Sequence, residues 1–220
     1  MSQLVFKFPF KTKYYEQDYY VSSNNFSAYR LIESWPNWPD KWVNIFGPKG
    51  CGKTHLTNIL KKKIKKIKIF NAKTLDESKI SELNNLECII IDSYEQNIDE
   101  IFFYSILNHF RQLDSYVVIN SVMPIKSMPI KLKDLKSRAD GFVSLGIELP
   151  TDDLLRVIIS KSFSEKQINL SPKISEYIIK NIERSYEKVF KFIKEIDDLS
   201  LSSGKSININ LIKKVLINNE

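Results

Sequence analysis

The sequence predicts an α/β fold: a parallel sheet sandwiched between helices, followed by a small all-helical lid. Short runs that are apolar at nearly every position alternate with segments of helical periodicity, which is typical of parallel strands covered on both faces. A glycine-rich loop lies between the first run and the next helical segment. After Pro150 only helical periodicity remains, which indicates a separate helical unit.

The apolar runs define the expected strands of the sheet. Each run is short, rich in β-branched or aromatic residues, and bounded by polar residues or glycine, as buried strands are. The expected strands are Trp42–Phe46, Ile67–Phe70, Leu86–Asp92, Tyr116–Asn120 and Phe142–Leu145.

Helices are expected between these strands, where apolar residues recur at helical spacing. They cover residues 25–34, the segment from the glycine-rich loop to Ile64, and residues 98–113. The turn-rich segment 35–40 ends the first helix, and its tryptophans are expected to pack the turn against the body of the protein.

Four helices are expected after Pro150. Thr151 is a favourable N-cap for the first helix, and Ser171-Pro172 opens the second. The third includes residues 186–196, and the last includes residues 211–216 beyond Gly204. The expected organisation is an N-terminal extended tail at 1–12, an α/β base at 13–150 and a helical lid at 151–220.

Composition narrows the classes of partner and compartment. The chain has 33 basic and 26 acidic residues, a formal net charge of +7. This surplus suits an acidic partner such as nucleic acid, and it equally suits simple solubility. The two cysteines fit neither a metal site nor a disulfide framework, which favours a reducing compartment. No apolar stretch approaches 18 residues, so we expect no membrane contact and a cytoplasmic protein.

The strongest functional signal is a phosphate-binding loop that fits G-x-x-x-x-G-K-[ST]. Its glycines allow successive backbone N–H groups to point at phosphate oxygens, and the following helix N-terminus favours an anion. In such loops the lysine reaches the β- and γ-phosphates and the hydroxyl coordinates Mg²⁺. The loop consists of Gly47, Pro48, Lys49, Gly50, Cys51, Gly52, Lys53 and Thr54.

Asp92 ends the expected strand Leu86–Asp92, where a P-loop protein needs a carboxylate to hold Mg²⁺, in part through water. A hydrolytic enzyme of this kind usually has a second acid directly after that aspartate, and here the residue is Ser93. Glu95 lies two positions further on. Whether the chain hydrolyses nucleotide by itself therefore stays open, and we expect weak or absent activity.

Arg138 is the candidate catalytic arginine. Its planar guanidinium could stabilise transition-state charge on a nucleotide held by a neighbouring subunit, or it could be an ordinary surface arginine. His55 and His109 lie on expected helices without the spacing of metal ligands, so both are interpreted as structural or surface residues.

With these elements placed, the chain resembles the DnaA-related branch of the AAA+ ATPases along essentially its whole length. Gly47–Thr54 and Cys88–Asp92 match the Walker A and Walker B motifs, and Leu135–Arg138 matches the L-x-S-R element. Residues 19–25 resemble the segment that lines the adenine pocket in this family. The resemblance implies a P-loop AAA+ base, a ligand that is ADP or ATP with Mg²⁺, and an arginine finger that acts in trans. Beyond the loop it implies three further nucleotide contacts: Val21, Asn25 and His55.

Two features resemble the members of this branch that inactivate DnaA. The segment Gln3–Phe8 resembles the peptide that docks on the DNA polymerase sliding clamp (β), with Gln3, Leu4, Phe6 and Phe8 as the contacts. An ordinary edge strand is the alternative interpretation. We also expect no DNA-reading helix-turn-helix after the lid.

Three positions depart from the family pattern. Ser93 replaces the expected acid, and Val122 stands where DnaA has a polar sensor I residue. Glu187 occupies the sensor II position, with Arg184 or Lys188 as substitutes. These departures fit a protein that keeps its nucleotide as a structural or regulatory ligand.

The resemblance implies a bacterial negative regulator of replication initiation. It would bind the DNA-loaded clamp, and so the nucleoid, and promote hydrolysis of DnaA-bound ATP, touching DNA only indirectly or non-specifically. Alternatives are an autonomous DnaA-like or helicase-loader ATPase acting on DNA, and a binding module for which Arg138 is dispensable. The sequence leaves open whether the chain forms a homodimer.

Overall fold

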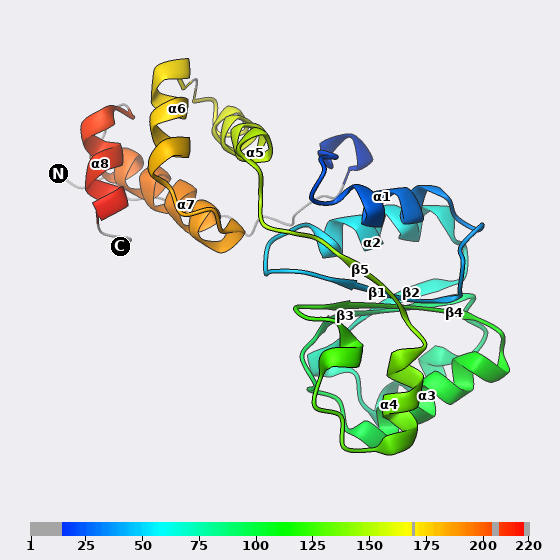
Figure 1. Cartoon of the computed structure of the whole chain (residues 1–220). Helices are drawn as coiled ribbons and strands as arrows, with labels where there is room; N and C mark the ends of the chain where they lie inside the picture. Colours follow the sequence, from blue (N-terminus) through cyan, green and yellow to red (C-terminus); the bar gives the residue numbers. More distant parts are fainter. Residues whose placement is uncertain (1–14, 169, 204–206, 218–220) are drawn as a thin grey trace. The chain divides into compact units, whose positions relative to one another are not determined.

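The computed structural model describes residues 15–168, 170–203 and 207–217 of the chain (Figure 1). The described residues up to Glu148 form one compact unit, and those from Leu149 form a second. No helix within the described ranges is both long and apolar enough to cross a membrane.

The first unit, the base, contains a five-stranded sheet in which every strand pair is parallel. The strand order is β2-β3-β4-β1-β5, so β1 lies between β4 and β5. This arrangement confirms the expected α/β class with a parallel sheet. The strands are β1 (Trp42–Phe46), β2 (Ile67–Asn71), β3 (Cys88–Tyr94), β4 (Tyr116–Ser121) and β5 (Val143–Gly146).

Helices cover both faces of this sheet (Figure 1). On one face lie α1 (Phe26–Glu33) and α2 (Lys53–Lys63), and on the other lie α3 (Glu100–Gln112) and α4 (Lys133–Asp140). Short 3-10 helices connect the elements at Glu16–Asp18, Ala72–Thr74, Glu77–Leu83 and Ile125–Ser127.

The base contains one α-helix that the sequence did not predict. In α4 only Leu135 and Ala139 are buried, one helical turn apart, and the remaining positions are polar or charged. Two apolar residues are too few to establish a helical period, so the segment was not recognised as a helix.

The tryptophan-rich turn packs against the base, as expected. The Trp35 ring centroid lies 5.0 Å from that of Trp38 and 4.3 Å from that of Tyr116. The Trp38 indole N–H also donates to the carbonyl oxygen of Leu31 at 2.6 Å.

The second unit, the lid, is a cluster of four helices. Both expected N-caps are present: the Thr151 hydroxyl accepts from the Leu154 N–H and the Ser171 hydroxyl from the Ile174 N–H. Its core joins all four helices, with Phe163, Ile178, Phe192 and Ile212 among the fully buried residues. The helices are α5 (Asp152–Ser164), α6 (Pro172–Asn181), α7 (Tyr186–Ser203) and α8 (Ile209–Ile217).

The parallel sheet gives the base two different edges. The glycine-rich loop follows β1 at the carboxyl edge, whereas the segments that precede β1, β4 and β5 lie at the amino edge. Because a parallel strand rises about 3.3 Å per residue, the five residues of β1 separate these edges by roughly 15 Å.

We predict that Phe103→Ala lowers the free energy of unfolding by about 3–5 kcal/mol. Phe103 is fully buried in α3 and its ring lies 4.7 Å from that of Tyr94, so truncation leaves a cavity in the core. Urea denaturation followed by circular dichroism measures the change. Ile101→Ala, on the same helix but 68% exposed, is the matched control and should change stability by less than about 0.5 kcal/mol. Equal effects of the two substitutions would contradict the packing described here.

Candidate nucleotide-binding site

The loop between β1 and α2 has a backbone conformation that favours glycine at three of its positions. Gly47, Gly50 and Gly52 have φ angles of 155°, 83° and 97°. A Cβ atom at Gly47 would lie 2.5 Å from the Ile147 carbonyl oxygen, and one at Gly52 would lie 3.0 Å from the Tyr19 ring. The glycine pattern recognised in the sequence is therefore required by backbone conformation and by close neighbours.

The Lys53 ammonium lies inside the curve of this loop. Its Nζ donates to the carbonyl oxygens of Gly47 at 2.7 Å and Pro48 at 2.9 Å. It also lies 3.6 Å from the Cys51 Sγ. Burial raises the pKa of the Cys51 thiol, and the nearby Lys53 charge opposes that rise only in part. The curve of the loop therefore holds the Lys53 ammonium beside the buried Cys51 thiol.

Thr54 and Asp92 meet beside the loop. The Thr54 hydroxyl lies 3.2 and 3.1 Å from the two carboxylate oxygens of Asp92. A hydroxyl and a carboxylate are the oxygen ligands that P-loop proteins offer to Mg²⁺, and both are in place. Within the described part of the chain there is no group of three or more His, Cys, Asp or Glu that could hold a metal. A Mg²⁺ ion at Thr54 and Asp92 would need phosphate oxygens as further ligands.

Asn120, at the end of β4, extends this polar group. Its side-chain amide donates to Asp92 at 2.6 Å and to the Thr57 hydroxyl at 3.2 Å. Its Oδ1 is buried and accepts no hydrogen bond. Val122, which the resemblance places at sensor I, is 42% exposed, so the polar side chain that reaches Asp92 comes two residues earlier. Asn120 was expected at the end of the strand Tyr116–Asn120 but was not predicted as a site residue.

The chain beyond Asp92 turns sharply. The β3–β4 register shifts between Ile91 and Tyr94, and Ser93 has a φ of 60°. The Glu95 carboxylate lies 3.2 Å from the Lys49 ammonium, so it pairs with the loop. Ser93 thus stands directly after Asp92, where an acid would orient the attacking water. The next acid along the chain, Glu95, is paired with Lys49.

Aromatic rings and a turn flank the α2 end of the loop. The Tyr19 ring packs edge-on against His55 with centroids 5.3 Å apart, and the His55 Nε2 lies 2.6 Å from the Tyr15 carbonyl oxygen. Asn25 is buried; its Oδ1 accepts from the Ser22 N–H at 3.0 Å and its Nδ2 donates to the Tyr20 carbonyl oxygen at 2.9 Å.

Asn25 thus shapes the segment that precedes α1, within which Val21 is half-buried. Tyr19 was missing from the sequence-based site. Its position over Gly52 depends on a contact between residues more than thirty positions apart, although the Tyr19-Tyr20 pair lay within the quoted segment.

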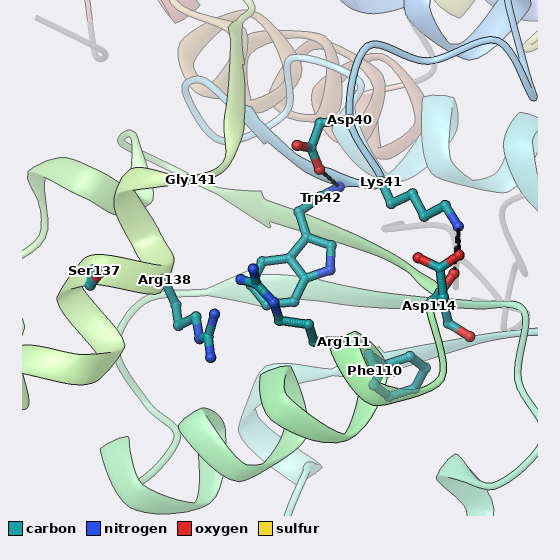
Figure 2. A pocket seen from close by; sticks show the side chains of 10 residues that line it. Asp40, Lys41, Trp42, Phe110, Arg111, Asp114, Ser137, Arg138 and Gly141 are labelled. Carbon is teal, nitrogen blue, oxygen red and sulfur yellow. Dashed lines mark hydrogen bonds and ion pairs between the residues drawn. The ribbon is translucent and has the colours of Figure 1, made fainter.

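Arg138 lies at the other edge of the sheet. It belongs to α4, and its Nη2 donates to the Asn108 Oδ1 at 3.1 Å. It lines a pocket beside Trp42, the first residue of β1 (Figure 2). The length of β1 therefore separates Arg138 from the loop of its own chain.

Two other groups of expected site residues remain. Gln3, Leu4, Phe6 and Phe8 fall outside the described residues. In the lid, Arg184 pairs with Asp152 at 3.0 Å, Lys188 lies 3.5 Å from Glu183, and Glu187 is exposed.

Two family models match the chain. Residues 152–216 match "Hda, lid domain", and residues 43–128 match "RNA helicase". The first match covers the four helices of the lid almost to their ends, and the second covers β1 to β4 with the glycine-rich loop.

Curated relatives include the chromosomal replication initiator protein DnaA. The DnaA of Buchnera aphidicola subsp. Cinara cedri is 24% identical over 87% of this chain and 48% of its own length. The DnaA of Buchnera aphidicola subsp. Baizongia pistaciae is 24% identical over 98% of this chain and 53% of its own length. The chain thus spans about half the length of these relatives. An uncharacterized protein of Haemophilus influenzae is 19% identical over 91% of this chain and 92% of its own length.

Solved structures of DnaA share the fold. Domain III of Thermotoga maritima DnaA superposes with a TM-score of 0.79 at 16% identity, covering 96% of this chain and 98% of that one. DnaA bound to AMPPCP and single-stranded DNA superposes with a TM-score of 0.70 at 20% identity. This match covers 88% of this chain and 67% of that one. These findings confirm the resemblance to the DnaA-related AAA+ proteins and the expected base and helical lid.

We predict that Lys53→Ala weakens nucleotide affinity by about 10- to 100-fold, because a charged hydrogen bond to phosphate contributes about 1.5–3 kcal/mol. Titration with a fluorescent ATP analogue in the presence of Mg²⁺ measures this. Lys49→Ala is the control within the same loop: the Lys49 side chain is 67% exposed and pairs with Glu95, so affinity should change less than about threefold. An equal loss of nucleotide affinity for the two substitutions would contradict a specific role of Lys53 in phosphate binding.

Proposed function

We propose that this chain is a negative regulator of bacterial replication initiation that acts on ATP-bound DnaA. Its lid matches the Hda lid domain, and the chain is similar to DnaA in sequence and in fold. Hda is the regulatory inactivator of DnaA, and the lid match supports proposing the same role for this chain. The proposal has three parts: an arginine that acts in trans, a nucleotide held at the chain's own loop, and attachment to the sliding clamp.

The separation of Arg138 from the loop carries the proposal. Arg138 cannot contact phosphates bound at Lys53 of the same base, because the length of β1, roughly 15 Å, separates them. Its hydrogen-bond partner is the neutral amide of Asn108, which leaves the guanidinium charge uncompensated. We infer that Arg138 meets a nucleotide bound by a second molecule, where its planar fork would stabilise the charge of phosphoryl transfer.

The chain's own nucleotide, ADP or ATP with Mg²⁺, has a structural or regulatory role in this proposal. The loop, Thr54 and Asp92 supply phosphate and metal contacts. Ser93 offers no carboxylate after Asp92, and Glu95 is paired with Lys49. Weak or absent hydrolysis at this site is the consequence that we propose.

The tail at residues 3–8 would bring the chain to its place of action. We propose that Gln3, Leu4, Phe6 and Phe8 dock on the β clamp as an extended peptide, with alternate side chains in an apolar groove. The basic surplus would support non-specific proximity to DNA in the cytoplasm.

One observation favours an autonomous DNA-dependent ATPase as a second candidate. Asn120, Asp92 and Thr54 together form a polar group that could bind Mg²⁺ and a γ-phosphate. Appreciable turnover by the purified chain, stimulated by single-stranded DNA, would favour this candidate over the regulator.

We predict that Arg138→Ala lowers the promoted hydrolysis of DnaA-bound ATP by about 10³-fold or more, the contribution expected of an arginine finger. Single-turnover release of phosphate from DnaA loaded with radiolabelled ATP measures the rate, in the presence of clamp loaded on DNA. Lys136→Ala, an exposed cation on the same helix, is the control and should keep the native rate. A full rate with Arg138→Ala would exclude this role and favour the binding-module alternative.

We predict that deletion of residues 1–8 abolishes binding to the cognate sliding clamp, because the apolar anchors Leu4, Phe6 and Phe8 are then lost. Surface plasmon resonance on immobilised clamp measures it, with Lys13→Ala as a nearby control that keeps every anchor. Undiminished binding after the deletion would remove the tail from the proposal. Failure of the intact chain to bind would favour the loader-type ATPase.

A further inference from the structure

The pocket that contains Arg138 holds a second guanidinium that the proposed function does not use. The pocket has a volume of about 540 Å³ and lies at the amino edge of the sheet. Figure 2 shows Arg111, from α3, and Arg138, from α4, both directed into the space beside the Trp42 ring. Two arginines from different helices thus share one open pocket.

The Arg111 side chain is held against an aromatic face. Its guanidinium carbon lies 6.0 Å from the centroid of the buried Trp42 ring, within the range of a cation–π contact. Among the described residues, no carboxylate forms an ion pair with Arg111 or with Arg138, whose partner is the Asn108 amide. Both positive charges are therefore available to a ligand.

The carboxylates of the pocket are already engaged. Asp114 pairs with Lys41, and Asp40 accepts the backbone N–H of Trp42 at 3.0 Å. Neither acid is bonded to an arginine. The pocket therefore presents two guanidinium groups without an ion-pair partner, and the positive charge of such groups attracts phosphate oxygens.

We propose that Arg111 and Arg138 form a two-arginine site for the polyphosphate of a nucleotide held by a second AAA+ subunit. The inference rests on the proposed function, in which Arg138 meets the nucleotide of DnaA, and adds Arg111 as a residue that recognises the incoming phosphates. The two arginines differ in solvent exposure, and we assign them different roles on that basis. Arg138 is half-buried and hydrogen-bonded, which suits a group that must be oriented in the transition state. Arg111 is exposed at the pocket, which suits attraction and binding of the phosphates.

The two arginines should therefore differ in kinetics. Loss of Arg111 should raise the chain concentration that half-saturates promoted hydrolysis by about three- to fivefold, as for an exposed charge pair. The maximal rate should stay within about twofold, because an interaction equal in ground and transition states alters only binding. The effect should shrink at higher salt, since screening weakens exposed charges. Arg111→Lys should largely restore the native value because the positive charge remains.

The test is single-turnover hydrolysis of DnaA-bound ATP over a range of chain concentrations, at low and high salt. Arg111→Gln and Arg111→Lys are compared with Lys136→Gln, which removes an exposed charge of α4 outside the pocket. A salt-dependent rise in the half-saturating concentration for Arg111→Gln alone supports the inference. The inference would be overturned if Arg111→Gln and Lys136→Gln gave the same half-saturating concentration. It would also be overturned if Arg111→Gln and Arg111→Lys raised that concentration equally. Neither result would affect the role of Arg138.

A second measurement does not depend on DnaA. Inorganic tripolyphosphate is titrated into the Lys53→Ala chain, in which the glycine-rich loop is disabled, and the indole N–H resonance of Trp42 is followed by NMR. Binding at the two-arginine site should shift this resonance, and Arg111→Gln should suppress the shift. No shift, or one unaffected by Arg111→Gln, overturns the site. An unchanged maximal rate with Arg138→Ala beside an Arg111-dependent shift would instead locate the failure in the proposed function.

Discussion

The common direction of all five strands is the constraint on which the rest of the base depends. Parallel pairing brings the strand carboxyl ends to one edge, and so places the glycine-rich loop beside Asp92 and Asn120. It also places Trp42 and the residues before β4 and β5 at the opposite edge, where α3 and α4 add Arg111 and Arg138. The carboxyl edge carries the candidate nucleotide site, and the amino edge carries the arginines that we propose act on a nucleotide bound by a different molecule.

Buried polar contacts then orient the groups at the carboxyl edge. Asp92 is bonded by both Thr54 and Asn120, so its carboxylate has little freedom to turn. Asn44, fully buried in β1, donates to the Ile119 carbonyl oxygen at 3.0 Å and accepts from the Ile125 N–H at 2.9 Å, which ties β1 to the end of β4. Such satisfied polar groups position functional side chains without leaving unpaired donors in the core.

The sequence was sufficient for features that depend on local pattern. Apolar runs located the strands, helix caps located α5 and α6, and the glycine spacing located the loop, because each is determined within about ten residues. Features that depend on distant contacts were missed. Helix α4 has too few apolar residues to show a period, Tyr19 reaches Gly52 across the fold, and Arg111 shares a pocket with Arg138 only once α3 and α4 have packed. The resemblance to the family placed sensor I at Val122, whereas the structure brings the Asn120 side chain to Asp92.

The central claim is that Arg138 acts on a nucleotide other than the one its own chain binds. The most direct measurement is the single-turnover rate of hydrolysis of ATP bound to the isolated chain, native and Arg138→Ala, at successive dilutions. The account predicts that the two rates, however slow, become equal at high dilution, because the length of β1 separates Arg138 from the loop. A slower rate for Arg138→Ala that persists at the lowest concentration would place the arginine at its own chain's nucleotide and contradict the account.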